Sequence, residues 1–88
     1  MKVNLNFEVK DLSGKSIEGT NVGKILAEVM VRSSKGDSIK IMDWALKLYN
    51  KQEIEISDGD FDTFKSLVEN NEEITVLVKA PILKELSK

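Results

Sequence analysis

Apolar residues follow two different periods along the chain, and these periods predict the elements of the fold. Residues 3–9 alternate strictly between apolar and polar side chains, which is typical of a strand with one buried face. Turn-forming residues follow at 11–14, where Gly14 can adopt a positive φ, and residues 15–18 can return as a shorter strand. The pattern predicts an N-terminal β-hairpin whose apolar face needs a helix or a third strand against it.

The next segment, residues 22–30, has the clearest helical pattern in the chain. Its apolar residues recur at i, i+3, i+4, i+7 and i+8, so they lie on one face of a helix. Thr20 or Asn21 is in position to cap the first turn of this helix. Residues 33–36 are expected to end it, because they include a glycine suited to the left-handed conformation after a last turn. So short a connection predicts an antiparallel neighbour.

Two apolar faces run along residues 37–50, which hold the only Trp and the only Tyr of the chain. The first face consists of Ile41, Trp44, Ala45 and Leu48. The second face consists of Met42, Leu46 and Tyr49. An apolar surface this wide contacts neighbours on more than one side. We therefore expect the central helix of the fold here, with Asp37 as its N-cap.

A further strand and a further helix are expected after the central helix. Residues 53–57 alternate between polar and apolar again, which predicts a short third strand beside the hairpin. Residues 58–70 carry apolar side chains at helical spacing, and Ser57 and Asp60 stand at the spacing of a capping box. This segment is therefore predicted to be a helix.

The C-terminal residues 74–86 fit two structures. β-branched residues at the start favour a strand, whereas apolar residues continue at helical spacing to the end, and we favour a helix kinked at Pro81. The whole chain, residues 1–88, is expected to be a single domain of the α+β class. In it an N-terminal β-hairpin, extended or not by the third short strand, packs on three to four helices.

The absence of two residue types excludes much of the usual chemistry of active sites. The 88 residues contain no Cys and no His, so disulfides, thiolate nucleophiles, imidazole bases, and zinc or copper sites with nitrogen and sulfur ligands are excluded. Carboxylate or lysine chemistry remains open, but a chain this short has little surface from which to form a pocket. We expect no enzyme, and no catalytic, cofactor or metal site.

Two short motifs resemble ligand sites without the residues that such sites need around them. Residues 14–16, Gly-Lys-Ser, match the end of a phosphate-binding loop, but Val9 replaces its first Gly and no helix is expected to follow. We interpret them as a hairpin turn. The acids at positions 58, 60, 62 and 69 match four ligand positions of a calcium loop. There Thr63 replaces the turn-forming Gly, and the segment is predicted to be helical, so its acids would point to different sides.

Charge is unevenly distributed, although the formal net charge is only −2. Residues 53–73 contain eight acids and one base, a net charge of −7, whereas the remaining residues together carry +5. Such an asymmetry allows an acidic face to bind a basic partner, or acidic and basic faces to dock in self-association, although a solvated surface is the simpler interpretation. The candidate partner-binding face consists of Glu53, Glu55, Asp58, Asp60 and Asp62.

Neither nucleic acid nor membrane is an expected partner. The basic residues are interspersed with acids, and the aromatic residues stand at core positions rather than in a row on which bases could stack. No apolar run has the length of a membrane span or the form of a signal peptide, so a cytoplasmic location is expected.

The order of helices and turns resembles that of small phage and prophage proteins of unknown role. The resemblance rests on three stretches of the chain: ILAEVMV, SSKGDSIKIMDWALKLYNKQEIEISDGDFDTFKSLVE and VLVKAPILKEL. It implies an accessory or assembly role through protein contacts, and it carries over no functional residue. Our leading hypothesis is a small non-catalytic domain that binds a protein partner or itself. The alternatives are an inhibitor of a host defence nuclease that acts through the acidic face, and a carboxylate-dependent enzyme.

Overall fold

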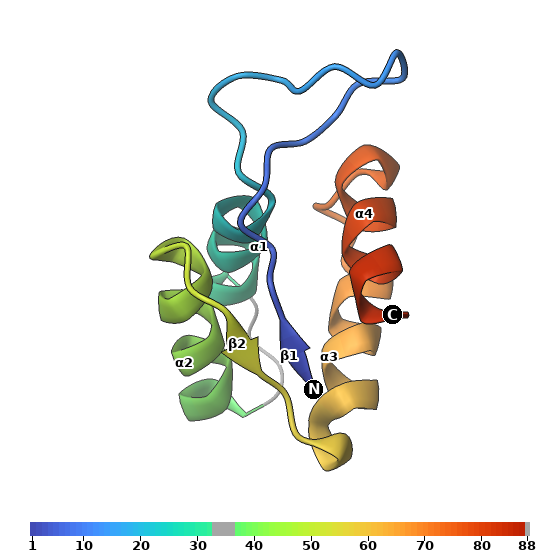
Figure 1. Ribbon diagram of the computed structural model, residues 1–88. Coiled ribbons are helices and arrows are strands. Elements are labelled where there is room, and N and C mark those ends of the chain that lie inside the picture. Colours follow the sequence, from blue (N-terminus) through green and yellow to red (C-terminus); the bar gives the residue numbers. More distant parts are fainter. Residues whose placement is uncertain (33–36, 88) are drawn as a thin grey trace.

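The computed structural model describes residues 1–32 and 37–87 (Figure 1). These residues form four helices and two short strands, which supports the α+β class. In chain order the elements are β1 (Lys2–Val3), α1 (Val22–Val31), α2 (Ser38–Tyr49), β2 (Ile54–Glu55), α3 (Asp58–Glu69) and α4 (Val76–Leu86). The predicted end of the first helix at residues 33–36 lies outside the described residues. None of the described helices is long and apolar enough to span a membrane.

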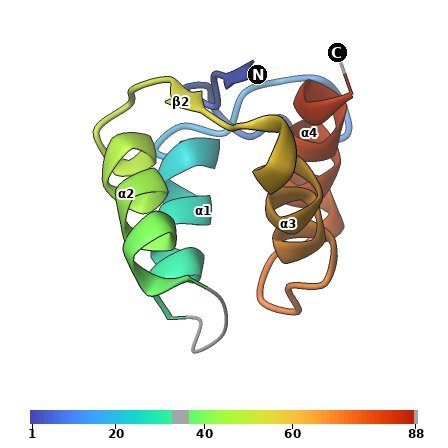
Figure 2. The same cartoon turned by 90° about the horizontal axis from the view of Figure 1, so that it is seen from below.

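The four helices form two pairs that lie side by side, α1 with α2 and α3 with α4 (Figure 1). The strands and the extended N-terminal residues cover one side of both pairs (Figure 2). A ring contact joins the pairs inside the molecule: Trp44 of α2 meets Phe64 of α3 edge-on, with ring centroids 5.2 Å apart and an interplanar angle of 86°. Both rings are buried in the hydrophobic core, to which all six elements contribute.

The predicted third strand pairs with the start of the chain. β1 and β2 are antiparallel, with Lys2 opposite Glu55 and Val3 opposite Ile54. The ladder continues by one residue, because Ile56 donates its N–H to the Met1 carbonyl at 2.8 Å. Residues 1–3 therefore pair with residues 54–56, and the segment between them contains α1 and α2.

The predicted N-terminal hairpin is present as a chain reversal, not as a pair of long strands. One antiparallel bridge joins Lys10 and Ser16, and Ile17 donates its N–H to the Val9 carbonyl at 2.7 Å. The expected strand over residues 3–9 ends after Val3 because backbone carbonyls beyond it accept hydrogen bonds from the start of α1. The carbonyls of residues 5 and 7 accept the N–H groups of residues 23 and 22, at 3.0 and 2.9 Å.

This second bonding pattern has a clear physical reason. The first N–H groups of a helix have no partner within the helix. Those at the start of α1 find one in the carbonyls of Leu5 and Phe7, so these carbonyls do not extend a strand ladder with the returning chain. The side-chain alternation still holds, since Val3, Leu5 and Val9 are buried. Alternation thus identified the inward face correctly, and the hydrogen bonds to α1 decided the secondary structure.

Asn21, one of the two residues proposed to cap the first helix, is its N-cap, and the predicted N-cap of the second helix, Asp37, is confirmed. The side chain of Asn21 accepts the Lys24 N–H at 3.0 Å, and that of Asp37 accepts the Lys40 N–H at 3.1 Å. α1 and α2 pack closely at Gly23. A Cβ added there would lie 3.2 Å from the Leu48 carbonyl oxygen and 3.2 Å from the Leu5 carbonyl oxygen, so a larger residue would force these backbone groups to shift.

The last two helices agree with the helical predictions for residues 58–70 and 74–86. Ser57 precedes α3, but it makes no side-chain cap; its hydroxyl instead donates to the Asp60 carboxylate at 2.9 Å, so the predicted capping box is wrong. α4 contains Pro81 and buries Val78, Ile82 and Leu86 at intervals of four residues. Helical periodicity therefore outweighed the β-branched residues before Pro81.

Candidate functional site

The structure places the five predicted acidic-face residues on two consecutive elements, β2 with the residue before it and the start of α3. Glu53 and Glu55 lie before and in β2, whereas the three aspartates fall in the first turns of α3. A helix turns about 100° per residue, so Asp58 and Asp62 share one side of α3 and Asp60 lies on another. Asp60 faces α2 and forms an ion pair with Lys40, with 2.9 Å between Nζ and Oδ1.

The Lys40–Asp60 pair changes the proton affinity of both groups. The pKa of Asp60 lies below its ordinary value of 3.8, because Lys40 and secondarily Ser57 donate hydrogen bonds to the carboxylate. The same bond raises the pKa of Lys40. Asp60 is therefore occupied within the molecule, where it links α2 to α3, and is a poor candidate for contact with a partner.

Other members of the acidic stretch also pair with basic groups inside the molecule. Arg32, at the end of α1, contacts Glu73 with 3.0 Å between Nε and Oε2. Lys65 and Glu69 form a pair within α3 at 3.9 Å, and Lys79 of α4 donates to the Glu69 carbonyl at 3.0 Å. Two acids of the stretch, Asp60 and Glu73, therefore form ion pairs with basic residues of α2 and the end of α1.

The two motifs that resembled ligand sites take other structures. The acids expected at calcium-loop spacing lie along α3, and within the described parts of the chain no group of three or more acids is placed to hold a metal ion. Gly14 has φ +90° in a turn, as predicted. There the Asp11 carboxylate accepts the Ser13 hydroxyl and the backbone N–H groups of Ser13 and Lys15, which lowers the pKa of Asp11.

Large apolar side chains are exposed on α2, where a solvated helix face usually carries polar residues. We define the apolar ridge as Val31 of α1 with Ile39, Met42, Leu46 and Tyr49 of α2. Each of these residues is between 47% and 86% exposed, although the second apolar face of the central helix was expected to contact neighbours within the chain. That expectation is wrong: α1 and the core cover only the face that contains Trp44, which is 5% exposed.

The ridge borders a shallow apolar groove between α1 and α2. The groove has a volume of about 190 Å³, and the small side chains of Ala27 and Ala45 lie between the larger ridge residues. Charged groups stand at its edges: the Lys24 ammonium lies 5.1 Å from the centre of the Tyr49 ring. Contiguous apolar surface of this kind, rimmed by polar groups, is typical of sites where proteins bind one another.

The sequence pattern identified three of the five ridge residues but predicted that they would be buried within the chain. Met42, Leu46 and Tyr49 were recognised as a second apolar face, whereas Ile39 and Val31 were missed. The spacing of 3, 4 and 3 residues from Ile39 to Tyr49 was the available signal, since it marks the seam by which one helix packs on another. Whether the seam is filled from within the chain depends on the tertiary structure.

Comparison with known proteins identified no relative of this chain. No protein-family model, no curated protein and no solved structure matches the chain.

Proposed function

We propose that the protein is a small non-catalytic protein-interaction domain, and that the apolar ridge of α1 and α2 is its contact surface. The observation that carries the proposal is the exposure of five large apolar side chains on the two helices, four of which line one groove between them. Leaving such side chains in water forgoes stabilisation of about 1.5–3 kcal/mol for each one fully buried. A partner that covers the ridge recovers part of that free energy, which makes association favourable.

The occupant we propose is a second copy of the same chain. Ile39, Met42, Leu46 and Tyr49 have the spacing of a coiled-coil seam, so the surface they form fits another helix. Two α2 helices packed antiparallel about residue 44 place Ile39 opposite Tyr49 of the other copy, and Met42 opposite its Leu46. Every large side chain of the seam then meets another apolar one.

The charges beside the seam suit this arrangement. Asp43 and Lys47 pair on the outer side of α2, with 3.2 Å between Oδ2 and Nζ. Apposition of two copies therefore brings two neutral acid–base pairs together, which avoids the cost of opposing like charges. Val31 widens the surface onto α1, so two α1–α2 pairs would pack as a four-helix arrangement. An accessory or assembly role for a phage or prophage protein requires contacts of this general kind.

The alternative, an inhibitor of a host defence nuclease that uses the acidic face, has a narrower basis. Glu53, Asp58 and Asp62 are exposed and available to a basic partner. Asp60 is paired with Lys40, and Glu55 lies 3.5 Å from the Met1 nitrogen. This version predicts loss of inhibition when Asp58 and Asp62 are changed to asparagine, whatever happens to the ridge.

Disulfide trapping tests the proposed dimer and its direction together. The chain contains no cysteine, so single-cysteine variants give unambiguous cross-links. An antiparallel seam predicts that an oxidised mixture of Ile39→Cys and Tyr49→Cys chains forms the mixed dimer. Neither variant alone should cross-link efficiently, because identical positions lie ten residues out of register, about 15 Å along the helix.

A control variant measures random collision. Leu12 is fully exposed on the N-terminal turn, away from the ridge, so Leu12→Cys reports encounters that do not depend on the seam. Efficient self-cross-linking of Ile39→Cys, without the mixed product, would show a parallel pairing and reject the proposed register. Cross-linking of all three variants at the rate of Leu12→Cys would reject the dimer itself.

A further inference from the structure

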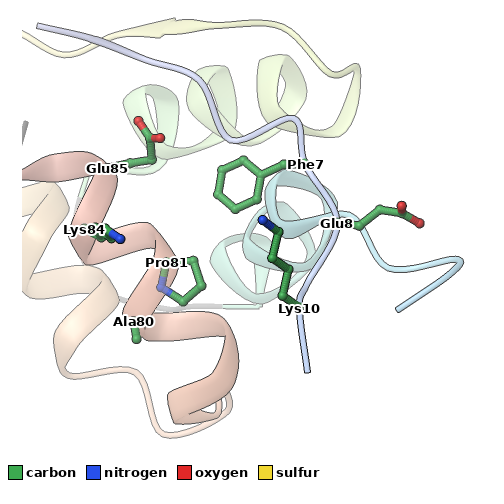
Figure 3. A pocket seen from close by; sticks show the side chains of 7 residues that line it. All are labelled: Phe7, Glu8, Lys10, Ala80, Pro81, Lys84 and Glu85. Carbon is green, nitrogen blue, oxygen red and sulfur yellow. The ribbon is translucent and has the colours of Figure 1, made fainter. Parts of the chain in front are cut away.

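A second groove lies on the opposite part of the molecule, between the N-terminal extended residues and α4 (Figure 3). It has a volume of about 490 Å³, within the range of roughly 300–1,000 Å³ that is common for small-molecule sites. Its lining consists of Phe7, Glu8, Lys10, Ala80, Pro81, Lys84 and Glu85. It shares no residue with the apolar ridge.

The apolar walls of this groove are held in place by the fold. Phe7 packs against the hydrophobic core, and its carbonyl accepts the N–H of Val22 at the start of α1 at 2.9 Å. Val9 is buried, and its N–H donates to the Thr20 hydroxyl at 3.1 Å. On the other side, Ala80 and Pro81 belong to α4. The ring of Phe7 and the ring of Pro81 therefore face the same space from two fixed backbones (Figure 3).

The charged side chains of the groove are arranged asymmetrically. Lys10 extends its ammonium group toward the Phe7 ring at the space between the two walls, whereas the carboxylate of Glu8 turns away from it (Figure 3). Lys84 lines the α4 wall of the same groove. Within residues 1–32 and 37–87, no ion pair joins either lysine to a carboxylate. Lys10 thus places a positive charge beside the aromatic ring of Phe7.

We propose that this groove binds a small carboxylate with an aromatic body. The body would lie between Phe7 and Pro81, where ring contacts and burial favour it, and the carboxylate would lie near Lys10 and Lys84. A carboxylate suits the site better than a phosphate because the lining has no arginine fork and no helix N-terminus. Single lysines on flexible stems supply charge without the geometry that phosphate sites usually have.

The direct test is an NMR titration of the ¹⁵N-labelled protein with phenylacetate. We expect fast-exchange shifts concentrated at Phe7, Lys10, Ala80 and Lys84, with the amides of Met42 and Leu46 on the ridge unmoved. Phenylacetamide, which keeps the ring and removes the charge, should bind several-fold more weakly. Acetate, which keeps the charge and removes the ring, should do the same. Equal shifts with phenylacetate and phenylacetamide, or shifts confined to the ridge, would overturn the proposal.

Variants test the two lysines independently of folding. Each exposed charge pair typically changes affinity by a factor of about 2–5, so Lys10→Gln together with Lys84→Gln should weaken phenylacetate binding by roughly 5- to 20-fold. The matched control, Lys2→Gln together with Lys15→Gln, removes the same charge elsewhere and should leave binding near the wild-type value. Lys84→Glu should reduce the preference for phenylacetate over phenethylammonium, because the new carboxylate offsets the charge of Lys10. Equal weakening by both double variants would show a general charge effect and reject the site.

Discussion

α2 and α3 are helices of equal length, twelve residues each, but the outer face of α2 is apolar and that of α3 is polar. Each buries one apolar face, and the two faces meet through Trp44 and Phe64. The outer side of α3 carries Asp58, Asp62 and other polar residues, as expected for a surface meant for water. The outer side of α2 carries the apolar ridge. Since one apolar face is enough to fold either helix, the second face on α2 points to a use outside the chain.

The largest effect should come from the inner face of α2. Trp44→Ala removes a buried ring and its edge contact with Phe64, so it should lower the free energy of unfolding by about 3–5 kcal/mol. Tyr49→Ala, on the outer face of the same helix, should cost less than about 1 kcal/mol in the monomer because that ring is half exposed. Urea titrations followed by circular dichroism measure both. Similar losses for the two variants would mean that the faces of α2 do not differ as described.

Two glycines give a smaller contrast between the helix pairs. Gly23→Ala should destabilise the fold by about 1–3 kcal/mol, because the new methyl would lie 3.2 Å from the backbone carbonyl oxygens of Leu48 and Leu5 and would force them to shift. Gly59→Ala in α3 meets nothing within 4 Å and should stabilise the fold by up to about 1 kcal/mol through helix propensity. Thermal unfolding of the two variants tests this difference in sign. A stabilised Gly23→Ala would show that α1 and α2 pack less closely than the structure has them.

The smallest effect concerns the ion pair between Lys40 of α2 and Asp60 of α3. The pKa of Asp60 is lowered in the folded state, so its contribution to stability is present above its ordinary pKa of 3.8 and is lost as the pH falls through the lowered value. Asp60→Asn should therefore reduce stability at neutral pH and flatten its decline in acid. Asp62→Asn, two residues away and without an ion-pair partner in the described residues, is the control. Identical pH profiles for the two variants would assign no role to the Lys40 contact.

Helix caps, which depend on neighbouring residues, were predictable from the sequence. Hydrogen bonds and ion pairs between residues far apart in the sequence were not. The caps at Asn21 and Asp37 depend on residues three positions apart; Asp37 was predicted, and Asn21 was one of two candidates. The hairpin strands were not, because the carbonyls of Leu5 and Phe7 bond to the start of α1, more than fourteen residues away. The pairing of Asp60 with Lys40, which divides the predicted acidic face, likewise depends on how α2 and α3 pack.

The ridge shows the same limit for apolar residues. The sequence marks Met42, Leu46 and Tyr49 as apolar at helical spacing, but it does not say whether a neighbour covers them. In this chain α1 packs closely on one face of α2, with Gly23 against Leu48, and borders the second face without covering it. The exposure of the ridge thus follows from the packing of α1, and exposure is what makes it a candidate interface.

The most direct test of the proposed function is the mass of the protein in solution, measured by light scattering on a sizing column at two protein concentrations and at low and high salt. We expect the mass to rise with concentration from the 9.9 kDa of one chain toward twice that value, and to be unaffected by salt, because the contact is apolar. Leu46→Lys should remain at one chain throughout, whereas Leu12→Lys should behave as the wild type. A strictly monomeric wild type would contradict the account. So would a dimer that salt disperses and Leu46→Lys leaves intact, since such a dimer would form through the charged faces.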